Sequence, residues 1–100
     1  MVIVGGTFEV NPNDRERFIT SRHELMRASR AEAGCIEYTF GADPIDPGRV
    51  VLFERWESQA ALDAHIAARR AQPRSPGDGV ATITSSIIIY DVSGERPLGG

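Results

Sequence analysis

The sequence predicts an α+β domain of the ferredoxin-like class, in which two helices cover one face of a four-stranded antiparallel sheet. Three observations lead to this prediction. Runs of β-branched residues and helix-periodic segments follow one another in the order β-α-β-β-α-β. Prolines, glycines and helix-capping residues separate these segments. The length of 100 residues suits one domain with a single core.

The first part of the chain predicts a strand and a long helix. The strand, Val2–Val10, is rich in β-branched residues. Asn11 can cap the following helix, and Pro12 suits its first position. We expect the helix to continue to about Ala33 and to end at Gly34, which can adopt the left-handed conformation. The residues expected on its buried face are spaced by three and four positions: Phe18, Arg22, Leu25, Met26, Ser29 and Ala33.

The middle of the chain predicts a hairpin and a shorter helix. The strands at residues 35–42 and 49–56 are joined by the turn-rich sequence DPIDPG. Ser58 is placed to cap a helix from about Gln59 to Arg70.

A loop and a last strand complete the predicted domain. Residues 71–79 contain two prolines and two glycines, so they should form a loop. Residues 80–92 are rich in isoleucine and threonine and should form a long strand. We therefore divide the chain into a folded domain, residues 1–92, and a C-terminal tail, residues 93–100.

Both faces of the predicted sheet carry apolar residues. In the third strand Val50 and Leu52 alternate with Val51 and Phe53, and the isoleucines of the last strand also point to both sides. Two helices can cover only one face, and an uncovered face normally alternates to polar residues. The pattern therefore predicts a homodimer in which two sheets pack face to face.

Composition and charge give no support for a nucleic-acid partner, a membrane partner or a metal site. The formal charge is −3, and all eleven basic residues are arginines without a long run, which gives no electrostatic case for nucleic acid or an anionic membrane. The segment MVIVGGTFEV lacks the features of a signal peptide, so we expect a cytoplasmic protein. One cysteine, Cys35, and two distant histidines, His23 and His65, predict no metal site.

His65 is the candidate catalytic residue. It shares one face of the second helix with Leu62, Ile66 and Arg69, so it should point toward the sheet. A buried histidine satisfied by a neighbour is one interpretation. The other is a general base beside an apolar pocket, because imidazole titrates near neutral pH and burial favours its neutral, proton-accepting form.

Other polar and aromatic residues are candidates for contact with a ligand. Glu54 falls on the same side of its strand as Trp56, where it can orient His65 or form an ion pair with Arg22. Tyr38 can anchor a polar ligand or lie in the core with its hydroxyl at the rim. Trp56 is expected in the core or in a pocket wall. We expect Cys35 to be an inert thiol and His23 to lie on the surface.

Two segments resemble the antibiotic biosynthesis monooxygenase family. They are EAGCIEYTF and VVLFERWESQAALDAH. The shared pattern is Gly-Cys with a tyrosine three positions after the cysteine, then an apolar strand ending in Glu-x-Trp, then a capping serine and a helix with Leu and His. The matching residues here are Gly34, Cys35, Tyr38, Glu54, Trp56, Ser58, Leu62 and His65.

This resemblance implies a dimeric α+β barrel and several activities. Members of the family oxygenate polycyclic anthrones or quinols without metal or flavin, and relatives degrade haem or isomerise small metabolites. Haem degradation is disfavoured, because the matching regions offer Thr7, His65 and the histidine-free segment RAQPRSP in place of the asparagine, tryptophan and histidine of that branch. In the oxygenase, a base removes a proton from the substrate, and the resulting anion reduces O2.

We therefore expect a cofactor-free monooxygenase that oxidises a phenolic, anthrone or quinol-like small molecule. His65 would act as the base, and a pocket between sheet and helices would be formed by Tyr38, Trp56, Phe18 and Phe40, with Arg22 and Glu54 as its polar groups. Two alternatives remain open at this point. They are a non-catalytic dimer that binds an aromatic ligand, and an isomerase of a small oxygenated metabolite.

Overall fold

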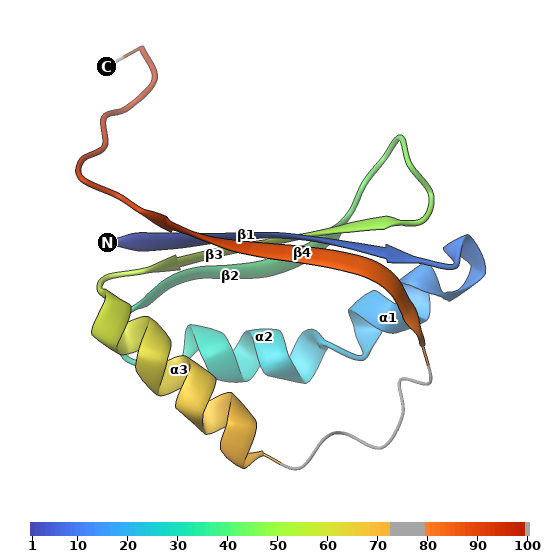
Figure 1. The fold of residues 1–100 in the computed structure, drawn as a ribbon, viewed down its shortest axis with the longest axis horizontal. Helices are drawn as coiled ribbons and strands as arrows, with labels where there is room; N and C mark the ends of the chain where they lie inside the picture. Colours follow the sequence, from blue (N-terminus) through green and yellow to red (C-terminus); the bar gives the residue numbers. More distant parts are fainter. Residues whose placement is uncertain (73–79, 100) are drawn as a thin grey trace.

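The computed structural model describes residues 1–72 and 80–99, and it confirms the predicted fold class. Four antiparallel strands form one sheet in the order β2-β3-β1-β4. All helices lie on one face of this sheet (Figure 1). The strands are β1 (Val2–Val10), β2 (Cys35–Ala42), β3 (Arg49–Trp56) and β4 (Thr82–Asp91), and the helices are the short 3-10 helix η1 (Pro12–Asp14), α1 (Arg15–Thr20), α2 (His23–Arg30) and α3 (Gln59–Ala71).

The prediction of one continuous first helix is wrong, because the helix is interrupted between α1 and α2. The carbonyl oxygen of Phe18 accepts hydrogen bonds from Ser21 Oγ at 2.6 Å and from Arg22 Nη1 at 3.1 Å. The backbone N–H of Arg22 donates to Ile19 O at 3.0 Å, which tightens the chain at this point. Side chains thus occupy a backbone acceptor, a competition that is known to bend helices.

The predicted end of this helix is also corrected. The helix α2 ends at Arg30, and Ala33, expected on the buried face, is exposed. A short turn then leads to Gly34, which has the expected positive φ of 83°. Glycine is required there for a second reason, since a Cβ at this position would lie 2.6 Å from Cβ of Ala61 on α3. Gly34 therefore allows the α2–β2 connection to lie directly against α3.

The caps and the core agree with the sequence pattern. Asn11 Oδ1 accepts from the backbone N–H of Asn13, and Ser58 Oγ accepts from that of Ala61 at 3.1 Å. On the predicted face of the first helix, Phe18, Met26 and Ser29 are buried. The buried apolar core lies between sheet and helices and consists of Val2, Val4, Val10, Phe18, Met26, Tyr38, Phe40, Val50, Leu52, Trp56 and Leu62.

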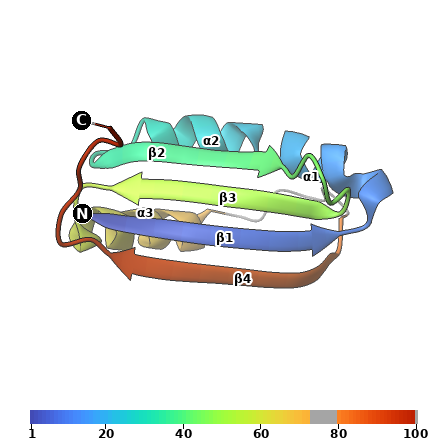
Figure 2. The same ribbon diagram turned by 90° about the horizontal axis from the view of Figure 1, so that it is seen from above.

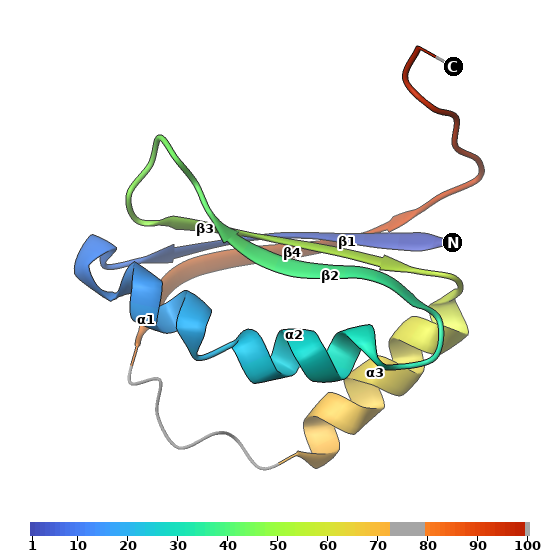
Figure 3. The same ribbon diagram turned by 180° about the vertical axis from the view of Figure 1, so that it is seen from behind.

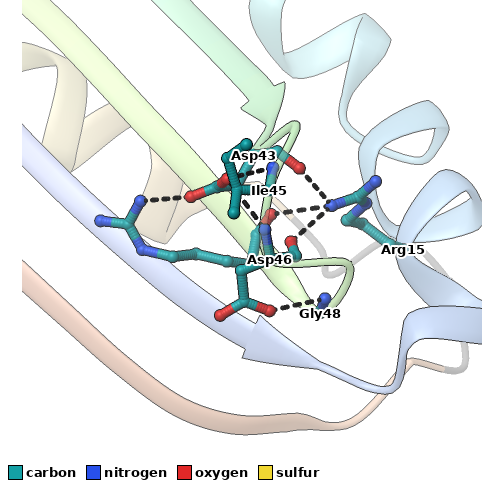
Figure 4. A network of polar contacts seen from close by, with 6 residues as sticks. Arg15, Asp43, Ile45, Asp46 and Gly48 are labelled. Atoms are coloured by element: carbon teal, nitrogen blue, oxygen red, sulfur yellow. Dashed lines mark hydrogen bonds and ion pairs between the residues drawn. The ribbon is translucent and has the colours of Figure 1, made fainter.

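The β2–β3 loop is held by a polar network at one end of the sheet (Figure 4). Asp43 Oδ1 accepts from the backbone N–H groups of Ile45 and Asp46, at 2.8 and 3.0 Å. Arg15 reaches the loop from α1, and its Nη1 donates to the carbonyl oxygens of Asp43 and Asp46, both at 2.8 Å. The turn-rich sequence DPIDPG therefore forms a specific loop that also connects the sheet to the helix layer.

The second face of the sheet is apolar and uncovered in the single chain. Val51 and Phe53 of β3 point away from the helices and are 37% and 40% exposed. In the register of β1 with β4, Ile88 and Tyr90 lie on this same face, and both are exposed. The views from both sides show no described helix or strand over it (Figures 1 and 3). The apolar alternation predicted for β3 is confirmed.

The strand β4 lies at the edge of the sheet beside β1 (Figure 2). Every residue of β4 is exposed, including Ile87 and Ile89, which face the helix side. The helix layer lies over the other strands, so it does not bury this edge (Figure 2). The predicted loop at residues 71–79 lies outside the described residues from residue 73 onward, and α3 includes Ala71.

Candidate functional site

His65 lies on the buried face of α3, as the helical spacing predicts, and only 5% of the residue is exposed. Its Nδ1 lies 3.0 Å from Oε1 and 3.3 Å from Oε2 of Glu32. Glu32 is 33 residues away in the sequence, in the turn between α2 and Gly34. The close contact of α3 with this turn therefore brings the two side chains together.

The Glu32–His65 pair defines which ring nitrogen is basic. An ionised carboxylate can only accept a hydrogen bond, so Nδ1 carries the ring proton and its N–H donates a hydrogen bond to Glu32. Nε2 of the neutral ring then holds the lone pair. If Nε2 takes up a proton, the adjacent carboxylate stabilises the resulting imidazolium, as in other carboxylate–histidine pairs. The pair thus has the geometry of a general base with its positioning carboxylate.

The predicted aromatic residues do come together, as a packed layer beneath His65. The ring of Trp56 lies 4.7 Å from that of His65, centroid to centroid, and the ring of Tyr38 lies 5.3 Å away. Phe40 contacts Tyr38 at 6.0 Å, and Phe18 contacts Phe40 at 6.4 Å. All four predicted aromatic residues are buried. They form a continuous aromatic wall that fixes the position of the imidazole.

Glu54 lies within this wall and bonds to Trp56. Its Oε1 accepts a hydrogen bond from Trp56 Nε1 at 3.0 Å. Burial raises the pKa of the Glu54 carboxyl, and the hydrogen bond from Trp56 partly opposes this effect. The hydrogen-bond partner of His65 is Glu32, so the orienting role considered for Glu54 belongs to a different carboxylate.

Tyr38 is a protonated phenol in this environment. Burial is the main reason why its pKa is raised, and the negative charge of Glu54 raises it further. The Tyr38 hydroxyl can therefore donate a hydrogen bond, but it does not act as an anionic base at neutral pH.

Arg22 lies at the break between α1 and α2, with its guanidinium carbon 3.5 Å from the centre of the Phe18 ring. This is cation–π geometry, and Nη1 also donates to Phe18 O. The ion pair considered between Arg22 and Glu54 does not form. Arg22 contacts Phe18 instead, and Glu54 accepts the hydrogen bond from Trp56. The Arg22 guanidinium thus lies against the aromatic core, with the Phe40 ring centre 5.6 Å away.

A cavity of about 1080 Å³ lies between α2 and α3 and reaches His65. It lies on the helix layer, whereas the expected pocket was between sheet and helices. Two predicted site residues, His65 and Arg22, line it, whereas Tyr38, Trp56, Phe18, Phe40 and Glu54 lie behind its wall. Its lining mixes charged and apolar groups, among them Arg22, Leu25, Glu32, His65, Ile66 and Arg69.

Neither Glu32 nor the cavity-lining Arg69 is among the site residues predicted from the sequence, although Arg69 is predicted on the same helix face as His65. One signal for Glu32 was available, since a carboxylate just after a helix C-terminus is electrostatically unfavourable and suggests a local partner. Arg69 lies four positions after His65 on α3, so the same helical spacing identifies it.

Three further findings concern the described residues. Within residues 1–72 and 80–99, no group of three or more His, Cys, Asp or Glu side chains could hold a metal ion. In the same ranges, no helix is long and apolar enough to cross a membrane. Burial raises the pKa of the Cys35 thiol, in agreement with an unreactive side chain.

Comparison with known proteins identifies relatives whose sequences match about two thirds of this chain. The Synechocystis protein sll1783 is 38% identical over 65 residues, which are 65% of this chain and 44% of that protein, so the matched segment spans less than half of the relative. YcnE of Bacillus subtilis, which is provisionally named a monooxygenase, is 29% identical over 65 residues, covering 65% of this chain and 68% of YcnE.

Solved structures agree with the observed fold. Rv0793 of Mycobacterium tuberculosis superposes with a TM-score of 0.71 at 28% identity, and the match covers 96% of this chain and 98% of that chain. A Deinococcus radiodurans structure has a TM-score of 0.75 at 21% identity with full coverage of both chains, which supports the fold alone. Residues 1–72 match the family description "antibiotic biosynthesis monooxygenase". The resemblance seen in the sequence is confirmed: this chain belongs to the antibiotic biosynthesis monooxygenase family.

Proposed function

We propose that this protein is a cofactor-independent monooxygenase that oxidises a phenolic, anthrone or quinol-like molecule with O2. The observation that carries the proposal is the Glu32–His65 pair, with Nδ1 bonded at 3.0 Å and the ring at the wall of a cavity. Family membership and the provisional monooxygenase name of YcnE support the general reaction class.

In the proposed reaction His65 Nε2 removes an acidic proton from the substrate, such as one from the CH2 group of an anthrone. The Glu32 carboxylate stabilises the imidazolium that forms. The carbanion then supplies the electrons that form a bond from carbon to one oxygen atom of O2. The hydroperoxide produced after protonation loses water and leaves a carbonyl group. One oxygen atom thus enters the product, the other leaves in water, and the substrate is the reductant.

The predicted binding residues have two roles in this proposal. Arg22 lines the cavity and can contact the substrate directly. The aromatic wall formed by Tyr38, Trp56, Phe18 and Phe40, together with Glu54, would act from behind the imidazole by holding it rigid and by excluding water. A base that is fixed and dry is more effective than a mobile, hydrated one.

Oxygen uptake with a panel of anthrones and quinols tests the proposed activity. We expect turnover by the intact protein and a loss of about 100-fold or more in His65→Ala, because a general base commonly contributes that much. His23→Ala is the matched control, since His23 is exposed on α2 and should leave turnover unchanged. Product formed without O2 would indicate an isomerase, and saturable binding without any product would indicate a ligand-binding protein; either result would contradict oxygenation.

The assembly of the protein and its location in the cytoplasm are part of the same proposal. We propose that residues 1–92 act as the functional domain, with residues 93–100 as a tail, and that two copies join through the apolar face that carries Val51 and Phe53. The exposure of that face supports the homodimer. The free Cys35 thiol is compatible with the reducing conditions of the cytoplasm.

A further inference from the structure

The charges that the described residues place along the α2–α3 cavity are not balanced. Among residues 1–72 and 80–99, its carboxylates are Glu24 and Glu32, and its guanidinium groups belong to Arg22, Arg69 and Arg70. Glu32 bonds to His65, and Glu24 forms an ion pair with Arg27, a residue outside the cavity. Both carboxylates therefore already have a partner.

Two of these arginines form no ion pair with the described part of the chain. Arg22 lies over the Phe18 ring and donates to a backbone oxygen. In contrast, no carboxylate among residues 1–72 and 80–99 forms an ion pair with Arg69 or Arg70. The cavity thus retains positive charge that is available to a ligand.

Arg69 is the better placed of these two residues. It follows His65 by four positions on α3, so both side chains lie on one helix face, one turn apart. Both residues also line the cavity. A ligand that reaches His65 therefore lies within reach of the Arg69 guanidinium.

We infer that the α2–α3 cavity binds an aromatic carboxylate, with Arg69 contacting the carboxylate and His65 facing the reacting group. This inference rests on the proposed function and names its substrate class. A guanidinium can bind a carboxylate through two parallel hydrogen bonds, which also orients the ligand. Leu25, Ala28, Ile66 and Val80 line the same cavity and provide apolar contact for the ring. The preferred substrate is thus a hydroxyaryl or quinol-type acid.

Calorimetric titration with a matched pair of probes tests this inference. Hydroxynaphthoic acid is an anion at neutral pH, whereas naphthol has the same ring system and is neutral. We expect the intact protein to bind the acid more tightly. Arg69→Gln should weaken binding of the acid by about tenfold or more, as for loss of a charge-assisted hydrogen bond, and should change naphthol binding less than twofold.

Two further variants make the test specific. Arg69→Lys keeps the charge and should retain more affinity for the acid than Arg69→Gln. Arg17→Gln removes an arginine on α1 whose ion-pair partner, Asp14, also lies outside the cavity lining, so it should leave both affinities unchanged. Unchanged binding of the acid by Arg69→Gln, equal weakening of both probes, or no binding of either probe at millimolar concentration would overturn the inference.

The binding test is separate from the test of catalysis. The titrations are performed without O2, so they do not depend on turnover. Arg69-dependent binding of the acid without oxygen uptake would retain this inference and contradict the monooxygenase. Turnover of neutral substrates with acid binding that is independent of Arg69 would retain the monooxygenase and contradict this inference.

Discussion

At the scale of single residues, the most informative feature is how His65 is held. The imidazole is bonded at Nδ1 by Glu32 and packed at 4.7 Å from Trp56. The carboxylate determines the tautomer, whereas the indole limits rotation of the ring. Neither partner is adjacent to His65 in the sequence. Spacing along α3 could show that His65 faces inward, but it could not show which carboxylate would meet it.

The Glu32→Gln variant tests the positioning role of this carboxylate. An amide carries no charge to stabilise an imidazolium, and it can donate to Nδ1 as well as accept from it, so it does not select one tautomer of the ring. We expect kcat with an active substrate to fall by about ten- to a hundredfold, as is typical when the partner of a functional histidine is changed. NMR of the ring nitrogens should also show loss of the single Nδ1-protonated tautomer.

The control for Glu32→Gln is Glu16→Gln, a change of an exposed carboxylate on α1. It should alter neither kcat nor the His65 nitrogen signals. If Glu32→Gln keeps the wild-type tautomer and rate, Glu32 does not position the base.

At the scale of the elements, two side chains determine features that periodicity alone does not predict. Ser21 and Arg22 fit the average helix pattern, yet their bonds to the Phe18 carbonyl oxygen interrupt the helix between α1 and α2. The β2–β3 loop is the converse case. Its composition predicted a turn, but the contact of Arg15 with the loop carbonyl groups arises only when α1 lies beside the loop.

Asp43 should give this loop a distinct response to pH. Hydrogen bonds from the backbone of Asp46 and Ile45 and from Arg49 lower the pKa of Asp43 to about 2. A carboxyl whose pKa is lowered on folding binds fewer protons in the folded state, so its contribution to stability is complete above about pH 4. That contribution is lost as the pH falls toward 2.

The Asp43→Asn variant tests this expectation by thermal unfolding between neutral pH and pH about 2. The variant should have a lower Tm than the wild type at neutral pH, and the difference in Tm should shrink in acid, because the native advantage of the charged side chain disappears. Asp91→Asn, at the exposed end of β4, is the control and should show no such pH-dependent difference. A Tm difference that stays constant with pH would contradict a role for the Asp43 charge.

At the scale of the whole molecule, one chain leaves an apolar sheet face uncovered. The helices bury the face with Val50 and Leu52, whereas Val51, Phe53, Ile88 and Tyr90 remain exposed on the other. A second sheet would bury these side chains and yield roughly 25 cal/mol for each Å² removed from water. The proposed homodimer would therefore add stability that a domain of this size gains with difficulty from its own core.

Phe53→Glu tests the homodimer by analytical ultracentrifugation. A carboxylate in the centre of an apolar interface has no partner, so we expect the dissociation constant to rise by about 100-fold or more. Ala67→Glu adds the same charge to an exposed position of α3 in the helix layer and should leave the dimer intact. Sedimentation of the wild-type protein as a monomer at micromolar concentration would contradict the proposed assembly.

Local chemistry in the sequence determined the order of the elements, their caps and the two apolar faces of β3. These features depend on neighbouring residues, such as Ser58 with the backbone of Ala61, so they can be read from short segments. The tertiary structure alone decided the Glu32–His65 pair and the location of the cavity in the helix layer. Each of these depends on which segments meet in space, because a hydrogen bond between distant residues leaves no periodic pattern in the sequence.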